Sequence, residues 1–230
     1  MKNKLISIIL CTFMLISVFS VTSLATQSRY ESFDISPVTL TSDAGENMAA
    51  VALSQLGKTG RDLGYTEEWC ADFVGDCAIL TGQSEAVPLY GGVEGLYTRL
   101  KDNNAAEITE APKKGDLVFI NWNGEARRGH IEIVYDFDEK TNTVYTVGGN
   151  TGSYSTVSER RVSTHKLTLG SDKIKNILRP AYSTCSDHTF GLFTCTRCGT
   201  LRPEISDFIN RLKAFIYNVK NMLTSFGVNK

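Results

Sequence analysis

EEWCADFVGDC, residues 67–77, places two cysteines seven residues apart in a segment whose apolar spacing predicts a helix over residues 70–80. At about 1.5 Å of rise per residue, the α-carbons of Cys70 and Cys77 would lie roughly 10 Å apart, beyond the ~7 Å limit for a disulfide. Cys70 lies in the first turn, where the helix dipole and unpaired N–H groups favour a thiolate. Cys77 lies two turns further in and is predicted to pack as a small apolar residue. Taken alone, Cys70 also fits an ordinary buried cysteine.

The segments around this helix predict one α+β domain over residues 45–182. Apolar residues spaced three and four apart predict helices at residues 46–55, 70–80 and 93–100. Runs of β-branched and aromatic residues predict strands at 117–122, 130–135 and 143–147, with the polar stretch 136–142 as a hairpin loop. Helices followed by an antiparallel sheet are typical of the α+β class.

The N-terminus has the pattern of an export signal. Two early lysines precede an apolar run from Leu5 to Val21, and small residues follow up to Ala25. Residues 1–25 are therefore predicted to be a signal peptide that is cleaved after Ala25, with an uncleaved membrane anchor as the alternative. Residues 26–44 are polar and aperiodic, so they are predicted to be a linker. The mature protein is expected to be exported.

A histidine far along the chain is a candidate base for a reactive cysteine. His130 begins a predicted strand directly after a glycine-containing turn, and nucleophilic cysteine catalysis pairs a thiol at a helix start with a distant imidazole. Asn150, after the next strand, is expected to accept a ring N–H of His130 and fix its tautomer, although a simple turn residue fits equally well. His165 lies in a polar segment and is expected to be a surface histidine.

Four motifs, in this order and spacing, resemble the CHAP family of cysteine- and histidine-dependent amidohydrolases and peptidases. They are EWCADFVGDCA (68–78), KKGDLVFI (113–120), GHIEIV (129–134) and VYTVGGNTG (144–152). The resemblance extends from about residue 46 to about residue 182, and the motifs are specific only in combination. It implies a papain-like α+β fold and hydrolysis of amide bonds in bacterial peptidoglycan.

The resemblance also implies roles for single residues. Cys70 would be the nucleophile, His130 the general base and acid, and Asn150 the residue that orients the histidine. Family members often have an acid two positions before this asparagine, where the present chain has Gly148. Glu132, two residues after His130 and on the same strand face, is a candidate substitute. A solvated glutamate on a half-exposed strand is the interpretation that strand alternation favours.

The expected reaction is acyl transfer from an amide to the Cys70 thiolate, without a metal at that site. Trp69 and Glu132 are predicted to contact the substrate, with core packing as the alternative for Trp69.

Three functions fit these residues. The first is an exported peptidoglycan hydrolase, either an N-acetylmuramoyl-L-alanine amidase or an endopeptidase of the stem or cross-bridge, secreted or associated with the cell wall. The others are a secreted peptidase acting on proteins and a catalytically idle module that binds the wall or a partner.

No nucleic-acid partner is expected, because the net charge is −1 and the chain has no basic run. A segment rich in cysteine and histidine, residues 183–202, follows the domain. Its C-x2-H and C-x2-C spacing is typical of tetrahedral zinc ligation by Cys185, His188, Cys195 and Cys198. Disulfide bonding is the alternative in an exported protein, but three cysteines cannot pair fully. We therefore predict a small zinc ribbon of structural role, since four protein ligands leave no open position.

The last segment, residues 203–230, is predicted to be an amphipathic helix, because apolar residues recur there with a period of 3.6. Packing on the domain, self-association and binding to a partner or a surface all fit this pattern.

Overall fold

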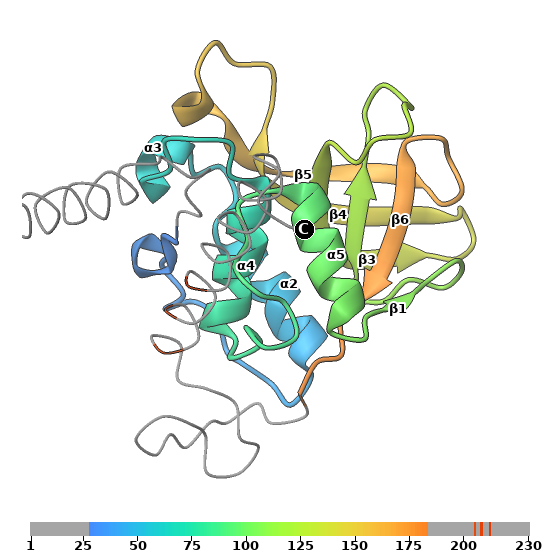
Figure 1. The fold of residues 1–230 in the computed structure, drawn as a ribbon, viewed down its shortest axis with the longest axis horizontal. Coiled ribbons are helices and arrows are strands. Elements are labelled where there is room, and N and C mark those ends of the chain that lie inside the picture. The colour runs from blue at the N-terminus through green and yellow to red at the C-terminus, as the bar shows by residue number, and fades with distance from the viewer. Residues whose placement is uncertain (1–27, 184–204, 206–207, 209–211, 213–230) are drawn as a thin grey trace, which may run out of the picture. The chain divides into compact units, whose positions relative to one another are not determined.

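The computed structural model describes residues 28–183, together with Ile205, Phe208 and Leu212. Helices and one antiparallel sheet make up this part, which confirms the predicted α+β class (Figure 1). The helical elements are η1 (Tyr30–Ser32), α2 (Ala44–Ser54), α3 (Gly60–Leu63), α4 (Cys70–Leu80), α5 (Val93–Asp102) and η2 (Val157–Glu159). The strands are β1 (Ala106–Glu107), β2 (Leu117–Ile120), β3 (His130–Asp138), β4 (Thr143–Thr151), β5 (Arg161–Thr168) and β6 (Ile174–Arg179).

The sheet has the strand order β1-β6-β2-β3-β4-β5, and neighbouring strands run antiparallel. The predicted strands correspond to β2, β3 and β4, but β3 and β4 extend further than expected. Their hairpin loop is therefore residues 139–142, shorter than predicted. Sequence analysis did not identify β5 or β6, whose mixed polar and apolar residues lack a clear alternation.

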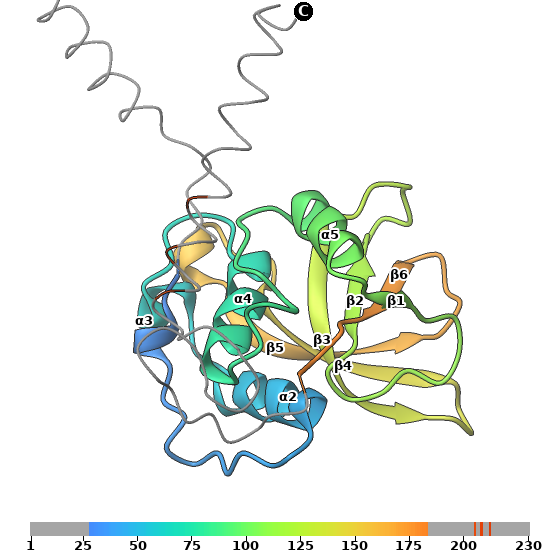
Figure 2. The same ribbon diagram turned by 60° about the horizontal axis from the view of Figure 1, so that its bottom comes forward.

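Helix α4 lies inside the molecule, where its ten residues from Cys70 to Ile79 are all buried. It contacts β3, β4 and α2, and Figures 1 and 2 show α2 and α4 together on one side of the sheet. A helix with apolar residues around its whole circumference is typical of a core element. Burying α4 also brings its N-terminus close to strands β3 and β4.

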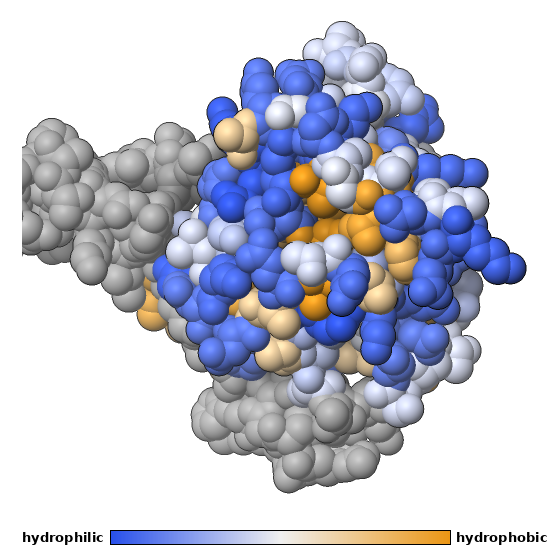
Figure 3. Space-filling model, turned by 90° about the vertical axis from the view of Figure 1, so that its right-hand side faces the viewer, coloured by the Kyte–Doolittle hydropathy of each residue, from blue (hydrophilic) through white to orange (hydrophobic). Residues whose placement is uncertain are grey.

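The sheet has buried apolar residues on both faces. One face belongs to the main core with α2 and α4, and it includes Leu117, Phe119, Ile131, Ile133 and Val147. The other face has a second cluster formed by Val118, Ile120, Val134, Val144, Leu167 and Ile177. Seen from the sheet side, apolar surface is visible within a hydrophilic rim (Figure 3). The polar residues of the candidate site share this second face.

The segment predicted as a linker is packed on the domain from residue 28 onward. Asp76 of α4 is fully buried and accepts hydrogen bonds from the Ser28 hydroxyl (2.8 Å), the Arg29 backbone N–H (2.7 Å) and the Tyr65 hydroxyl (2.5 Å). A buried carboxylate must be hydrogen-bonded, and the N-terminal segment supplies two of these donors. The prediction of a linker was wrong here because no apolar periodicity reveals a segment that is held by a buried acid.

Several predictions fall outside the described residues. These are the signal peptide (1–25) and the four zinc ligands Cys185, His188, Cys195 and Cys198. Of the predicted terminal helix, residues 203–230, the three described residues are helical. Within the described part of the chain, none of the helices has the length and apolarity that crossing a membrane requires.

Replacing Asp76 with alanine is expected to destabilise the domain by about 3 kcal/mol, because buried donors lose a charged acceptor. Tyr65→Phe is the matched control, since it removes one donor and is expected to cost about 1 kcal/mol. Urea unfolding of both variants measures the difference. Equal losses of stability in the two variants would contradict the central role of the carboxylate.

Candidate active site

Trp69 anchors the start of α4 as its N-cap residue. Its ring is fully buried, stacks on Tyr65 with ring centroids 4.7 Å apart, and meets Phe73 edge-on at 6.0 Å. Gly149 of β4 approaches so closely that any side chain there would collide with the indole. The prediction that Trp69 contacts substrate is wrong, because the ring is inaccessible. Its packing against Gly149 instead sets the position of Cys70 relative to β4.

The two cysteines of α4 are both free thiols. Cys70 is the first residue of the helix and is 6% exposed. The N–H of Phe73 donates the first hydrogen bond of the helix, to Trp69 at 2.9 Å, so the earlier N–H groups lack partners within the helix. Cys77 is fully buried, and this burial raises the pKa of its thiol well above the ordinary value. The predicted packing role of Cys77 is confirmed.

His130, the first residue of β3, lies between Cys70 and Glu132. Its Nε2 is 3.0 Å from Glu132 Oε1, which leaves Nδ1 for the thiol. Burial lowers the pKa of His130, but the hydrogen bond and charge of Cys70, and then those of Glu132, outweigh it and raise this pKa from 6.5 to about 10. The contact places the imidazole of His130 next to the Cys70 thiol, as proton exchange between them in nucleophilic cysteine catalysis requires.

Glu132 is fully buried, so the favoured interpretation of a solvated glutamate was wrong. Its Oε1 contacts His130 Nε2 at 3.0 Å and His165 Nδ1 at 2.8 Å, while its Oε2 accepts the Thr146 hydroxyl at 2.5 Å. Burial raises the pKa of Glu132, but these hydrogen bonds and the histidine charges prevail and lower it from 4.5 to about 2. Glu132 is thus an ionised acid that orients His130, and it is too buried to contact substrate as predicted.

Gly148 of β4 provides the space that the Glu132 side chain occupies. A Cβ built at residue 148 would lie 2.5 Å from Glu132 Cγ and 3.0 Å from its carboxyl carbon. The absence of an acid at residue 148 therefore does not leave the histidine without a carboxylate. The carboxylate that contacts His130 belongs to Glu132 of β3 and not to a residue of β4. The Glu132 side chain fills the space that a side chain at residue 148 would need.

Asn150 does not make the hydrogen bond to His130 that was predicted. Its side-chain amide donates to Glu68 Oε2 at 2.5 Å, and its oxygen accepts from Arg160 Nη1 at 3.2 Å. Arg160 also pairs with Glu68 at 2.5 Å. This correction has a simple cause, because Glu132 already occupies Nε2 of the histidine. Asn150 belongs instead to a polar cluster with Glu68 and Arg160.

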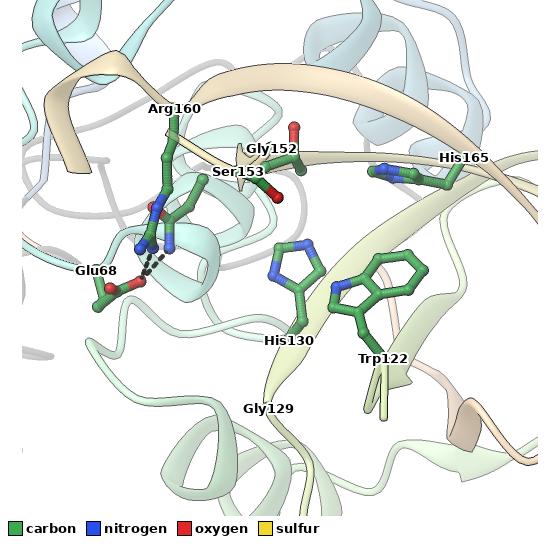
Figure 4. A pocket seen from close by; sticks show the side chains of 10 residues that line it. Glu68, Trp122, Gly129, His130, Gly152, Ser153, Arg160 and His165 are labelled. Carbon is green, nitrogen blue, oxygen red and sulfur yellow. Dashed lines mark hydrogen bonds and ion pairs between the residues drawn. The ribbon is translucent and has the colours of Figure 1, made fainter. Parts of the chain in front are cut away.

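A cavity of about 500 Å³ opens at these residues (Figure 4). The His130 ring borders it, with Trp122 beside it and the Glu68–Arg160 pair across from it. Its full lining is Glu68, Trp122, Gly129, His130, Asn150, Thr151, Gly152, Ser153, Arg160 and His165. The cavity combines an aromatic wall with charged groups of both signs, which suits a peptide substrate that has apolar and ionic parts.

Sequence analysis missed or misjudged several of these lining residues. Trp122, 41% exposed, lies past the end of β2, and its ring centroid is 5.9 Å from that of His130. His165 was expected to be a surface residue, but it lines the cavity and contacts Glu132. Glu68 directly precedes Trp69 and Cys70 in the sequence. This proximity was the only local signal that could have placed Glu68 at the cavity. No local pattern indicated Arg160, which lies 92 residues from its partner.

The raised pKa of His130 predicts a pH dependence of folding stability. Because its folded-state pKa (about 10) exceeds its unfolded value (6.5), the charged histidine stabilises the fold fully below pH 6.5, and this contribution is lost as pH rises through about 10. Unfolding free energies in urea at stepwise pH are expected to fall more steeply for the wild type than for His130→Gln over this window. Parallel curves would contradict the assignment.

Gly148→Ala is expected to displace the Glu132 carboxylate while leaving Cys70 and His130 in place. Alkylation of Cys70 by iodoacetamide should slow by about tenfold, the usual scale for losing a partner that orients a functional histidine. Gly92→Ala is the control, because a Cβ at Gly92 meets nothing within 4 Å. Mass spectrometry of the Cys70 peptide gives the rate. An unchanged alkylation rate in a folded Gly148→Ala protein would show that the reactivity of Cys70 does not depend on the space that Gly148 leaves for Glu132.

Comparison with known proteins bears on the same residues. The CHAP domain family model matches residues 60–150, from α3 to the end of β4. Neither the curated proteins nor the solved structures contain a match to the chain. The matched segment includes Cys70, His130 and Glu132 but ends before Arg160 and His165. The match supports the CHAP family for this part of the chain and, with it, a hydrolase of the amidase or peptidase type related to peptidoglycan.

Proposed function

We propose that this protein is an exported peptidoglycan hydrolase that cleaves an amide bond by thiol catalysis, as an N-acetylmuramoyl-L-alanine amidase or a stem or cross-bridge endopeptidase. The observation that supports it best is the line of contacts from Cys70 through His130 to the buried Glu132. Cys70 is the proposed nucleophile and His130 the proposed general base and acid. Glu132 orients the histidine in place of Asn150.

In the first half-reaction, the Cys70 thiolate attacks the amide carbonyl carbon and forms a tetrahedral intermediate. Backbone N–H groups at the start of α4, which have no partners within the helix, would donate hydrogen bonds to the developing oxyanion. His130 gives its Nδ1 proton to the amine nitrogen, the C–N bond breaks, and a thioester to Cys70 remains. Glu132 keeps the ring oriented through Nε2 and stabilises its positive charge.

In the second half-reaction, His130 is neutral and accepts a proton from water. The resulting hydroxide attacks the thioester, the C–S bond breaks, and the carboxylic acid product leaves with the Cys70 thiolate restored. No oxidant or reductant enters this sequence. Cys70 is 6% exposed and does not itself line the cavity, whereas His130, which contacts it, does.

The geometry also bears on the alternative of a catalytically idle binding module. An idle site has no need for a buried acid, a buried histidine and a helix-start thiol in contact. The alternative predicts that Cys70 is alkylated with an ordinary thiol pH profile, with a midpoint near pH ~8.5. The proposed hydrolase predicts fast alkylation well below that pH.

Cys70→Ala is expected to abolish hydrolysis of purified peptidoglycan, at least a thousandfold, because the nucleophile is lost while the fold is kept. Cys77→Ala is the matched control on the same helix and is expected to remain active with a modest loss of stability. Mass spectrometry of the released fragments identifies the new amino terminus. L-alanine next to muramic acid means an amidase, and a terminus within the stem or bridge means an endopeptidase.

Survival of wall hydrolysis in Cys70→Ala would overturn the proposed mechanism. Cleavage of casein with no release of wall fragments would favour the alternative of a secreted peptidase acting on proteins.

The terminal segments complete the proposal. We propose that residues 1–25 direct export, and that Cys185, His188, Cys195 and Cys198 hold one structural zinc ion, a spacing that supports tetrahedral ligation. The amphipathic segment 203–230 would then bind a partner, a second copy or a surface. The mass of the exported protein tests cleavage after Ala25. A metal-to-protein ratio near zero in that material would reject the zinc site.

A further inference from the structure

The buried Glu132 carboxylate is a meeting point of three strands. Val134 of β3 lies opposite Thr146 of β4, and Thr146 lies opposite His165 of β5. Cross-strand partners point to the same face of a sheet, as do residues two apart on one strand. The register therefore directs Glu132, Thr146 and His165 to one face, and their hydrogen bonds follow from it.

The two histidines bind the same oxygen of this carboxylate. Glu132 Oε1 is 3.0 Å from His130 Nε2 and 2.8 Å from His165 Nδ1, while Thr146 occupies Oε2. These are hydrogen-bond distances, and in the described part of the chain no group of His, Cys, Asp and Glu side chains is arranged to hold a metal ion. The cluster is therefore a hydrogen-bonded one, in which each oxygen of the acid has a strand-borne partner besides His130.

His165 separates the carboxylate from the cavity. Glu132 has no exposed side-chain surface, whereas the His165 side chain is 31% exposed and lines the cavity. Its ring centroid is 4.9 Å from that of Trp122, and Figure 4 shows the three rings of His165, Trp122 and His130 around the same opening. Replacing His165 would thus remove a donor and let water reach an acid that is otherwise dry.

We propose that His165 is a positioning residue of this site, in addition to the catalytic His130, and that its Nδ1–H holds Glu132 Oε1 in line with His130 Nε2. This inference rests on the proposed function for its consequence in turnover, but its structural content concerns only the reactivity of Cys70. A carboxylate held by one histidine and one hydroxyl can rotate. With a second donor on Oε1, its orientation toward His130 is fixed by residues of β4 and β5.

Two substitutions separate the donor from the bulk of the ring. His165→Asn keeps an N–H donor in the place of Nδ1, whereas His165→Leu keeps apolar volume and has no donor. We expect His165→Leu to lower kcat on soluble peptidoglycan fragments about tenfold with little change in KM, and His165→Asn to restore most of it. The iodoacetamide rate of Cys70 near pH 7 should change in parallel, because it reports the imidazolium beside the thiolate.

Wild-type rates in a folded His165→Leu protein would overturn the proposal, and so would equal losses in the Leu and Asn variants. If the Leu variant fails to fold, His165→Met replaces it in the same comparison. The two readouts keep the inferences apart. Should Cys70→Ala retain wall hydrolysis, the proposed function fails, while the alkylation rates of the position-165 variants still decide the role of His165.

Discussion

A charge cannot be buried in a protein without partners, and Glu132 imposes this constraint on the whole site. Its carboxylate has no access to solvent and depends on three side chains, from β3, β4 and β5. A shift of one residue in strand register would turn two of these partners to the opposite face. The same acid requires a residue without a side chain at Gly148. Burial of Glu132 therefore depends at once on the strand register, on glycine at residue 148 and on the three polar partners of the carboxylate.

The helix side of the site follows a different physical rule, that of close packing. Cys70 is a buried member of the main core, and Trp69 beside it fills the space over Gly149 and stacks on Tyr65. Asp76, two turns along the same helix, binds the N-terminal segment and Tyr65 through hydrogen bonds. The helix that carries the thiol is therefore held by aromatic packing and by the buried Asp76, whereas the histidine is held by its polar contact with Glu132.

These two arrangements meet at the cavity, and each group there has a distinct relation to solvent. The His130 ring borders the opening, while its orienting acid is sealed behind His165 and Trp122. Sealing the acid by itself raises its pKa, but its hydrogen bonds and the histidine charges prevail and keep it ionised. In this poorly solvated region the attraction between the carboxylate and an imidazolium is stronger than in water. The Glu68–Arg160 pair is exposed by comparison and lines the cavity. The buried acid and the exposed ion pair thus differ in their access to solvent.

Local patterns in the sequence were sufficient for the α+β class, the bounds of α4 within a residue, and the different roles of Cys70 and Cys77. These depend on neighbours along the chain, where periodicity and helix geometry apply. Only the tertiary structure decided which acid orients His130 and where Asn150 and His165 lie. Strand alternation predicts on which face of the sheet a residue lies, but only the packing of the sheet decides whether that face is exposed to solvent or buried. Glu132 was buried by strands 14 and 33 residues away, and no local pattern records such distant contacts.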